Sequence, residues 1–350
     1  ALTNKFAVGE SFPTLLLDRD LFIDRRDRTR IITNIFGEVD LLKDLNYRFN
    51  FAPDLTYYER GTHTFQNSTA AIDNYRTSNI LYENILTYNH IFDDLHKLKA
   101  TGLYSVQKYR QLGSGVSVED LPFEQQRYHN IGTAEKTLGR SSFLSEWQLE
   151  SYMLRLNYAL ADKYILTLTG RVDGSSRLAE GNKYGLFPSL AAAWLIDQEP
   201  FMASSFFDEF KIRLSYGEVG NTGIDPYQTQ GRVQRVGYSF GGQSVYGFQS
   251  AELANSDLRW ERTRQVDFGI DFGFLNSRLS GTIGVYQQST VDLLMNRQLP
   301  ITSGFESVLE NVGATKNTGF EFNISSINIT STDPKSFEWT TDIVFHTNKN

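Results

Sequence analysis

The sequence predicts an all-β protein, an antiparallel transmembrane β-barrel with long extracellular loops and short periplasmic turns. Three observations predict this class. Apolar and polar residues alternate along most of the chain, the connections between alternating segments are short and long in turn, and the polar face of these segments carries too much charge for a soluble core. Helical patterning is nearly absent, and only residues 200–210 are expected to form a short helical turn.

About twelve strands are predicted, each from a run in which every second residue is apolar. In the run 164–173, for example, Leu166 and Leu168 alternate with threonines. The run 260–275 has about sixteen residues, more than the roughly nine to eleven that a tilted membrane strand needs, so its excess would project beyond the lipid. The strands are expected near residues 31–39, 44–57, 79–92, 95–108, 146–160, 163–173, 185–196, 210–217, 258–275, 278–291, 318–328 and 336–347.

The connections sort into two groups. Short ones are expected at residues 40–43, 93–94, 161–162, 276–277 and 330–335. The link 197–209 is of middling length and occupies the place of a short connection in the alternation. Long ones are expected at residues 58–78, 109–145, 174–184, 218–257 and 292–317. Transmembrane barrels have short turns on one rim and long loops on the other, whereas a soluble sandwich has no reason to sort its loops in this way.

The two faces of the strands have different expected surroundings. The polar face would line a wet interior; it carries Arg155, Asn157, Arg171, Asp173, Lys211, Arg213, Asp267 and Asp271, together with Thr167, Thr169, Ser189 and Ala191. The apolar face would meet lipid, for instance at Leu166, Leu168, Leu190, Ala192 and Trp194, although a second sheet could also cover such a face. Aromatic residues near strand ends suit the membrane interfaces: Tyr152, Tyr164, Trp194, Trp260, Phe274 and Trp339.

The sequence contains no pattern that indicates catalysis, so the chain is not expected to be an enzyme. It has no cysteine, and its five histidines lack metal-site spacing and are expected in loops or on the surface. Ser175 lies outside any G-x-S-x-G elbow, and the glycines of 217–223 are expected in a turn rather than in a phosphate loop. A net charge of −7 disfavours nucleic acid as a partner. No metal or cofactor site is predicted.

One long loop, 221–257, has the composition of a binding surface. Aromatic rings with guanidinium and amide groups suit sugars or peptides, although a long loop packed on its neighbours would have the same composition. The candidate ligand-binding residues are Tyr227, Arg232, Arg235, Tyr238, Phe240, Tyr246 and Phe248. The stretch 173–177 (DGSSR) is expected to begin another external bend, between two strands of a hairpin.

From about residue 145 onward, the sequence resembles the SusC/RagA type of TonB-dependent outer-membrane transporter. The matching stretches follow the order of the family: 151–158, DKY at 162–164, DGSSR at 173–177, NKYGLFPS at 182–189, FKIRLSYG at 210–217, GN at 220–221, LRWE at 258–261, Gln265, DFGFLN at 271–276, DLL at 292–294, NVG at 311–313 and NTGFE at 317–321. Leu178 stands where the family more often has Phe, a small departure within an apolar site.

The resemblance implies a 22-stranded barrel plugged by an N-terminal domain, a SusD-like surface lipoprotein as a lid, and energy supplied through TonB. Residues 1–350 would then be part of the barrel domain, with the plug, the TonB-contact segment and the final strands outside them. The expected location is the outer membrane of a Gram-negative type of cell. The expected function is import of a nutrient, an oligosaccharide first of all. The alternatives are a peptide importer, a passive porin-like channel and a soluble β-sandwich that binds ligands.

Overall fold

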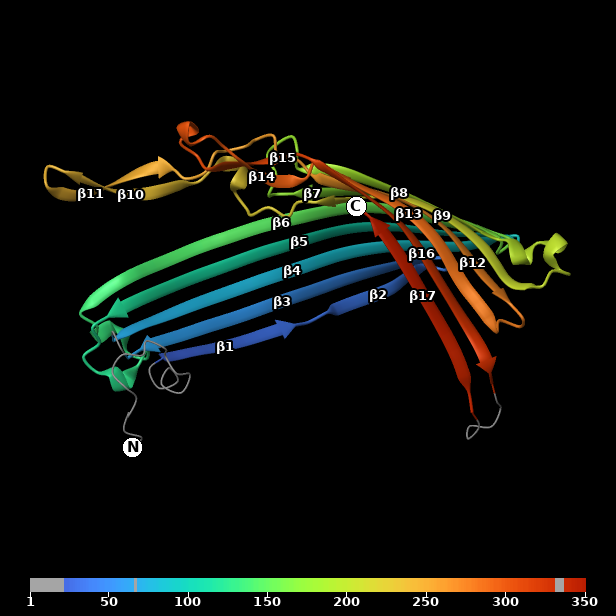
Figure 1. Cartoon of the computed structure of the whole chain (residues 1–350), viewed down its shortest axis with the longest axis horizontal. Coiled ribbons are helices and arrows are strands. Elements are labelled where there is room, and N and C mark those ends of the chain that lie inside the picture. The colour runs from blue at the N-terminus through green and yellow to red at the C-terminus, as the bar shows by residue number, and fades with distance from the viewer. Residues whose placement is uncertain (1–21, 66–67, 331–336) are drawn as a thin grey trace. The chain divides into compact units, whose positions relative to one another are not determined.

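The computed structural model describes residues 22–65, 68–330 and 337–350, and these consist mainly of antiparallel β-strands (Figure 1). The strands are β1 (Phe22–Ile32), β2 (Ile35–Leu42), β3 (Leu45–Thr64), β4 (Thr69–Phe92), β5 (His96–Glu119), β6 (Lys136–Leu160), β7 (Tyr164–Ser175), β8 (Tyr184–Leu195), β9 (Phe207–Asn221), β10 (Val233–Phe240), β11 (Gln243–Ser250), β12 (Glu261–Phe274), β13 (Leu279–Val291), β14 (Leu294–Gln298), β15 (Ser307–Asn311), β16 (Ala314–Ile329) and β17 (Trp339–Lys349). Across the described ranges, no helix has the length and apolar character that crossing a membrane requires.

Thirteen strands form one sheet, and from β3 onward each strand of this sheet pairs with its next strand along the chain. Its order is β1-β3-β4-β5-β6-β7-β8-β9-β12-β13-β16-β17, and β2 also pairs with β3. The remaining four strands form two separate hairpins, β10–β11 and β14–β15, between strands of the large sheet. This up-and-down antiparallel order confirms the predicted fold class.

The chain divides into two compact units. The first contains residues 1–34, 52–80 and 108–146, and the second contains residues 35–51, 81–107 and 147–350. In the described part of the first unit, a small core of Ala70, Val118, Leu121 and Tyr128 packs beside the strands. The Tyr128 ring lies over Gly61, where an added Cβ would stand 2.3 Å from a ring carbon, so this position needs a residue without a side chain.

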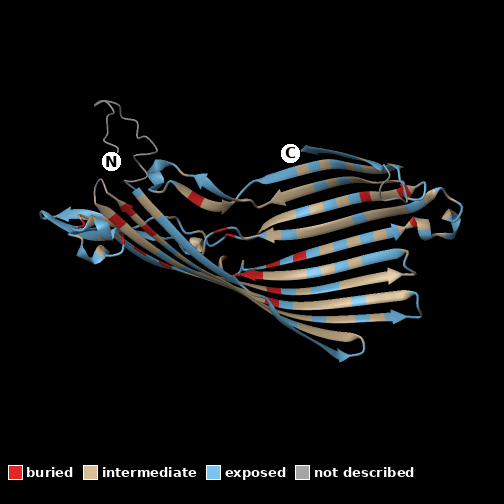
Figure 2. Cartoon of the chain, turned by 90° about the horizontal axis from the view of Figure 1, so that it is seen from below, coloured by how far each residue is buried: buried red, intermediate tan, exposed pale blue. Residues whose placement is uncertain are grey.

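The second unit carries the alternating membrane pattern most clearly. In the β7–β8 pair, Leu166 lies opposite Ala192 and Leu168 lies opposite Leu190. Leu168 and Leu190 are each 43 % exposed, while Thr167 on the other face is less exposed. Figure 2 shows exposed and intermediate residues alternating along the strands. The prediction that these leucines share one exposed face is confirmed.

The strands are more numerous and longer than predicted. β3 to β6 contain 20, 24, 24 and 25 residues, so much of the sequence assigned to loops 58–78 and 109–145 is strand. β1, with the sequence FIDRRDRTRII, was missed apart from its last two residues. Beyond the lipid both faces of a strand meet water, so apolar and polar residues no longer alternate there. The backbone pairing of the strands continues nevertheless. The predicted turn 330–335 lies almost wholly outside the described residues.

The short connections are confirmed at the turns that the structure describes. Asp93 and Asp94 have φ of 49° and 55°, and Ala161 and Asp162 have φ of 51° and 57°. Two consecutive residues with positive φ are typical of the tight turns whose twist matches that of a β-hairpin. Within 200–210, where a helical turn was expected, the structure has the 3-10 turn Pro200–Met202, and β9 begins at Phe207. Another 3-10 turn, Ile196–Gln198, precedes it.

Candidate functional site

A ladder of paired charges lies on the polar face of β9, β12 and β13. Arg213 donates two hydrogen bonds of 2.8 Å to the Asp271 carboxylate, and Lys211 approaches the same carboxylate at 3.3 Å. Thr282 from β13 donates a third hydrogen bond of 3.1 Å. The Arg213 guanidinium reaches this position by crossing Gly269, where an added Cβ would lie 2.9 Å from a guanidinium nitrogen. The Asp271 carboxylate on β12 is therefore held by donors from the two flanking strands, β9 and β13.

The same face continues onto β6 to β8 with further polar pairs. Arg171 contacts Asp173 at 2.7 Å and donates to Ser151 at 2.9 Å, and Thr167 donates to Asn157 at 2.9 Å. All eight charged or amide residues predicted on this face have a hydrogen-bond or ion-pair partner: Arg155, Asn157, Arg171, Asp173, Lys211, Arg213, Asp267 and Asp271. A cavity of about 290 Å³ opens beside them, with Arg213 and Asp267 in its wall. The face offers a ligand a wet surface of fixed charges.

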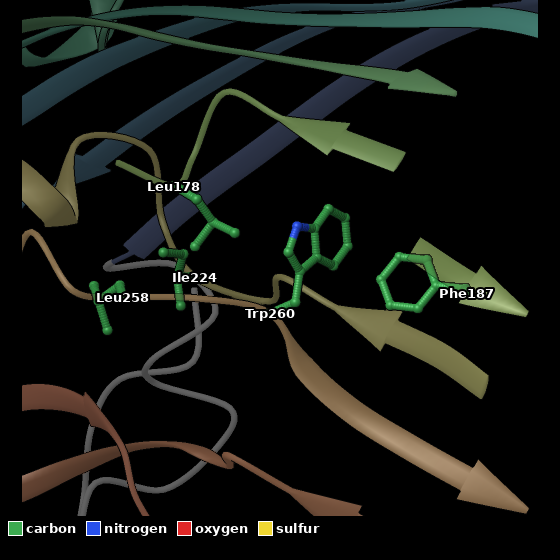
Figure 3. Close-up of a cluster of buried hydrophobic side chains, with 5 residues drawn as sticks. All are labelled: Leu178, Phe187, Ile224, Leu258 and Trp260. Carbon is green, nitrogen blue, oxygen red and sulfur yellow. The ribbon is translucent and has the colours of Figure 1, made fainter. Parts of the chain in front are cut away.

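An apolar cluster lies at the base of the long loops (Figure 3). This loop-base cluster consists of Leu178, Phe187, Ile224, Leu258 and Trp260. The rings of Phe187 and Trp260 meet edge to face at 5.2 Å, and the Trp260 indole donates to the Lys183 carbonyl at 2.9 Å. Leu178 is 2 % exposed, in agreement with its predicted apolar site. The cluster fastens three loop segments to the ends of their strands.

Two predictions at this cluster were wrong. Trp260 was expected at a membrane interface, but it is 6 % exposed because Phe187 and its own hydrogen bond hold it inside the cluster. Gly220 was expected in a turn, but it lies within β9, beneath the Phe187 ring. An added Cβ there would stand 2.2 Å from Phe187 and 2.7 Å from Trp260, so this glycine provides room for the two rings.

The stretch 173–177 joins neighbouring segments instead of forming a free polar bend. β7 extends to Ser175, which is 2 % exposed, so the bend begins two residues later than predicted. The backbone amide of Gln148 on β6 donates to the Ser176 hydroxyl at 2.8 Å, and the backbone amide of Ser176 donates to the Gln148 carbonyl at 3.0 Å. Arg177 stacks over Trp147 at 4.3 Å and donates to the Thr222 carbonyl at 3.1 Å. This stretch therefore ties β6 to the loop that follows β9.

The predicted binding residues lie on or beside the β10–β11 hairpin, which extends from that loop. Gly241 and Gly242, with φ of 58° and 81°, form its turn. Arg232 pairs with Glu252 at the base of the hairpin, and its guanidinium holds the pKa of the Glu252 carboxyl below the usual range. Tyr227 lies before the hairpin, at φ 71°. Arg232 thus lies at the base of the hairpin, and Tyr227 precedes it in the chain.

The hairpin register divides the other five predicted residues between two faces. Arg235 lies opposite Phe248, and Tyr246 is on the same face, with the Arg235 guanidinium 3.3 Å from the centre of its ring. Tyr238 and Phe240 lie on the opposite face. Phe240 is 80 % exposed and Phe248 is 75 % exposed. The structure thus brings together three of the seven predicted residues, and both hairpin faces present aromatic rings.

A second loop contact was missed by the sequence analysis. The β14–β15 hairpin lies within the segment expected to be loop 292–317. Its Asn311 side chain accepts from the Arg259 amide at 2.9 Å and donates to the Arg259 carbonyl at 2.8 Å. Asn255 donates to the Leu309 carbonyl at 2.8 Å. Since single asparagines give no signal in a sequence, only the geometry shows that the loops after β9 and β13 are held together.

No group of three or more His, Cys, Asp or Glu residues within the described ranges could hold a metal ion. The histidine prediction was wrong for His63, which is 0 % exposed within β3.

Comparisons with known proteins identify the family to which the fold belongs. The family model described as TonB dependent receptor-like, beta-barrel, matches residues 6–348. TonB-dependent receptor P3 of Formosa agariphila is 36 % identical over 337 residues, which cover 94 % of this chain and 33 % of that protein. TonB-dependent receptor SusC of Bacteroides thetaiotaomicron is 31 % identical over 323 residues, which cover 85 % of this chain and 31 % of SusC. The RagAB peptide importer in its closed-closed state superposes with a TM-score of 0.89 at 22 % identity, over 98 % of this chain and 38 % of that chain.

The chain therefore belongs to the TonB-dependent receptor β-barrel family, whose members are outer-membrane proteins. Within this family it is of the SusC/RagA type. Family membership excludes the soluble sandwich. The chain spans about one third of the length of the curated relatives that it matches.

Proposed function

We propose that this chain forms part of the barrel wall of a transporter that imports an oligosaccharide across the outer membrane. The observation that carries the proposal is the pairing of a fixed polar ladder on one face of the sheet with an apolar, exposed opposite face. Such a wall separates lipid from a wet passage without any catalytic group. Residues 1–350 would belong to the barrel domain. A plug, the segment that contacts TonB and further strands would belong to the rest of the protein, and a SusD-like lipoprotein would cover the outer side.

The choice of an oligosaccharide rests on the β10–β11 hairpin. Arg235, Tyr246 and Phe248 form one exposed face on which a sugar ring could stack while the guanidinium donates hydrogen bonds. A peptide is the second candidate, because aromatic side chains also accommodate peptide side chains and the similar RagAB structure is that of a peptide importer. The two substrate classes differ in the contacts that they make with the protein. A sugar stacks flat on an aromatic ring, whereas a peptide can also pair with an open strand edge.

The test shortens the hairpin in the full-length transporter. Residues 234–249 are replaced by Asn-Gly, which joins the paired residues Val233 and Ser250 by a two-residue turn. Uptake of labelled oligosaccharides should fall at least roughly tenfold, while the protein should still reach the outer membrane, because the hairpin lies outside the large sheet. The matched control shortens the β14–β15 connection at residues 299–306, which is exposed and carries none of the seven predicted binding residues.

Uptake of oligosaccharides at the normal rate by the shortened variant would contradict a binding role for the hairpin. Loss of peptide uptake alone would select the second substrate class. Uptake that continues after the inner-membrane energy source is removed would contradict TonB-dependent import and favour the passive channel.

A further inference from the structure

A row of positively charged side chains lies near the start of β12 and β16, on the face that carries the lipid-facing leucines of β7 and β8. Arg264 of β12 lies opposite Ser289 of β13, and Ser289 lies opposite Lys316 of β16. Residues directly opposite in an antiparallel pair project from the same face, as do alternate residues of one strand, so Arg262 shares this face. We call these four residues the cationic row.

The cationic row lies where the apolar band of the wall ends on its outer side. Every second residue of β12 from Phe274 back to Val266 is apolar, and the next position on this face is Arg264. Phe274 adjoins the short turn 275–278, and short turns are typical of the periplasmic rim. The ten residues from Phe274 to Arg264 span about 33 Å along the strand, or roughly 25 Å of height at a tilt of about 40°. This height equals the thickness of the apolar band, so Arg264 lies at the outer headgroup boundary.

One carboxylate serves both arginines of the row. Glu218 of β9 contacts Arg264 at 3.0 Å and Arg262 at 3.4 Å. It also accepts a hydrogen bond from Tyr216, and its side chain is 8 % exposed, whereas that of Arg264 is 52 % exposed. Lys316 is exposed and has no ion-pair partner among the residues that the structure describes. Three cations facing one carboxylate leave a surplus of positive charge beside the headgroups.

We propose that the cationic row binds a phosphate group carried by an outer-leaflet lipid. Arg264 and Lys316 lie two strands apart, so their backbones are separated by about 10 Å. Arginine and lysine side chains are long enough to meet over a gap of this size, which places a guanidinium and an ammonium on the same phosphate. The Ser289 hydroxyl between them supplies a further donor. Charge-assisted hydrogen bonds of this kind are the strong ones that proteins use for phosphates.

The apolar residues beside the row identify the carrier of the phosphate as a lipid. Val266 is 44 % exposed and Phe268 is 41 % exposed, and they occupy the next two positions of this face toward the membrane midplane. A phosphate held by the row therefore has an apolar surface beside it, along which the acyl chains of the same molecule lie. Free phosphate would contact the polar part of this surface alone.

The experiment measures lipid binding, so its outcome does not depend on what the transporter imports. The purified full-length protein in detergent is mixed with equal amounts of bisphosphorylated lipid A and enzymatically dephosphorylated lipid A, and native mass spectrometry counts each lipid that stays bound. The wild type should retain the phosphorylated form over the other by roughly three- to tenfold, the effect of two exposed charge pairs. Excess inorganic phosphate should not displace the lipid.

Variants of the row separate phosphate binding from a structural role. Lys316→Gln removes a side chain without an ion-pair partner within the described ranges, and it should lower the preference by roughly two- to threefold. Lys316→Arg should restore the preference, and Arg264→Gln combined with Lys316→Gln should bring the ratio to about one. Arg297→Gln is the matched control, because it removes one positive charge from the β14–β15 hairpin, outside the large sheet, and should leave the ratio unchanged.

Resistance of the folded band to detergent at room temperature reports whether each variant folds. A wild type without preference, or a folded double variant with the wild-type ratio, would overturn the proposal. Displacement of lipid A by inorganic phosphate would overturn the lipid as the occupant.

Discussion

At the residue scale, the position of Leu168 decides how the wall meets lipid. It lies four residues from Tyr164 and four from Val172, the register partner of Tyr152, so it is midway between two tyrosines expected at the membrane interfaces. Leu168→Arg in the full-length barrel should lower the free energy of unfolding by roughly 2–4 kcal/mol, the typical cost of an arginine facing lipid at the midplane. Thr167→Arg, on the polar face of the same strand, should lower it far less. A membrane-folding titration that gives equal values would refute this assignment of the faces.

His63 makes a second prediction at this scale. It lies eighteen residues beyond the start of β3, well above a membrane span of about nine to eleven residues. Its ring is fully buried against Phe65, and neither ring nitrogen has a hydrogen-bond partner within the described ranges. Burial lowers the pKa of His63 below its ordinary value of 6.5, opposed by the nearby Glu124 and reinforced by Arg127.

The direction of the pH effect follows from this pKa. A histidine whose pKa is lower in the folded state stabilises that state above its unfolded pKa, and the stability is lost as the pH falls from about 6.5 toward the folded value. The protection of backbone amides against hydrogen exchange around the core of Ala70, Val118 and Tyr128, measured relative to the intrinsic exchange rate at each pH, should therefore decrease between pH 7.5 and pH 5. In His63→Phe this loss of protection should be smaller. An equal loss of protection in both proteins would show that another group is responsible.

At the scale of elements, the loop-base cluster makes the loop that carries the β10–β11 hairpin depend on a strand glycine. Gly220→Ala places a Cβ 2.2 Å from Phe187, and shifting packed rings costs roughly 1–3 kcal/mol. The variant should make the loop 222–260 more sensitive to protease and should shift the fluorescence of Trp260. Gly217→Ala on the same strand is the control, because its Cβ would meet only Ser189, at 3.6 Å. Similar protease sensitivity in the two variants would mean that Gly220 does not hold the cluster.

The elements also show how far sequence patterns reach. Alternation predicted β7 and β8 closely because one face of each meets lipid and the other meets charges. It failed for β1 and for the ends of β3 to β6, where polar residues occupy both faces while backbone pairing continues. For the candidate site, composition selected the loop that carries the β10–β11 hairpin, and the Gly241-Gly242 turn was a usable signal of that hairpin. Only the register, which composition does not encode, separates Tyr246 from Tyr238.

At the scale of the whole molecule, the sheet has an open edge at each end of its strand order. Within the described residues, β17 pairs only with β16 and β1 pairs only with β3. Unpaired backbone groups are costly in lipid, and barrels avoid this cost by closing the sheet. The proposed function therefore requires strands outside residues 1–350 before this wall is stable in a membrane.

This requirement predicts that the isolated 350-residue chain does not insert as a monomer. Refolded with lipid vesicles, it should stay accessible to trypsin and show no band whose migration changes on heating, whereas the full-length protein should show both protection and the heat-modifiable band. Since edge strands pair readily with other edges, the isolated chain should instead form dimers or larger assemblies, measurable by crosslinking. A trypsin-protected monomer of the isolated chain would show that this segment satisfies its own edges, and the wall would then be a complete unit.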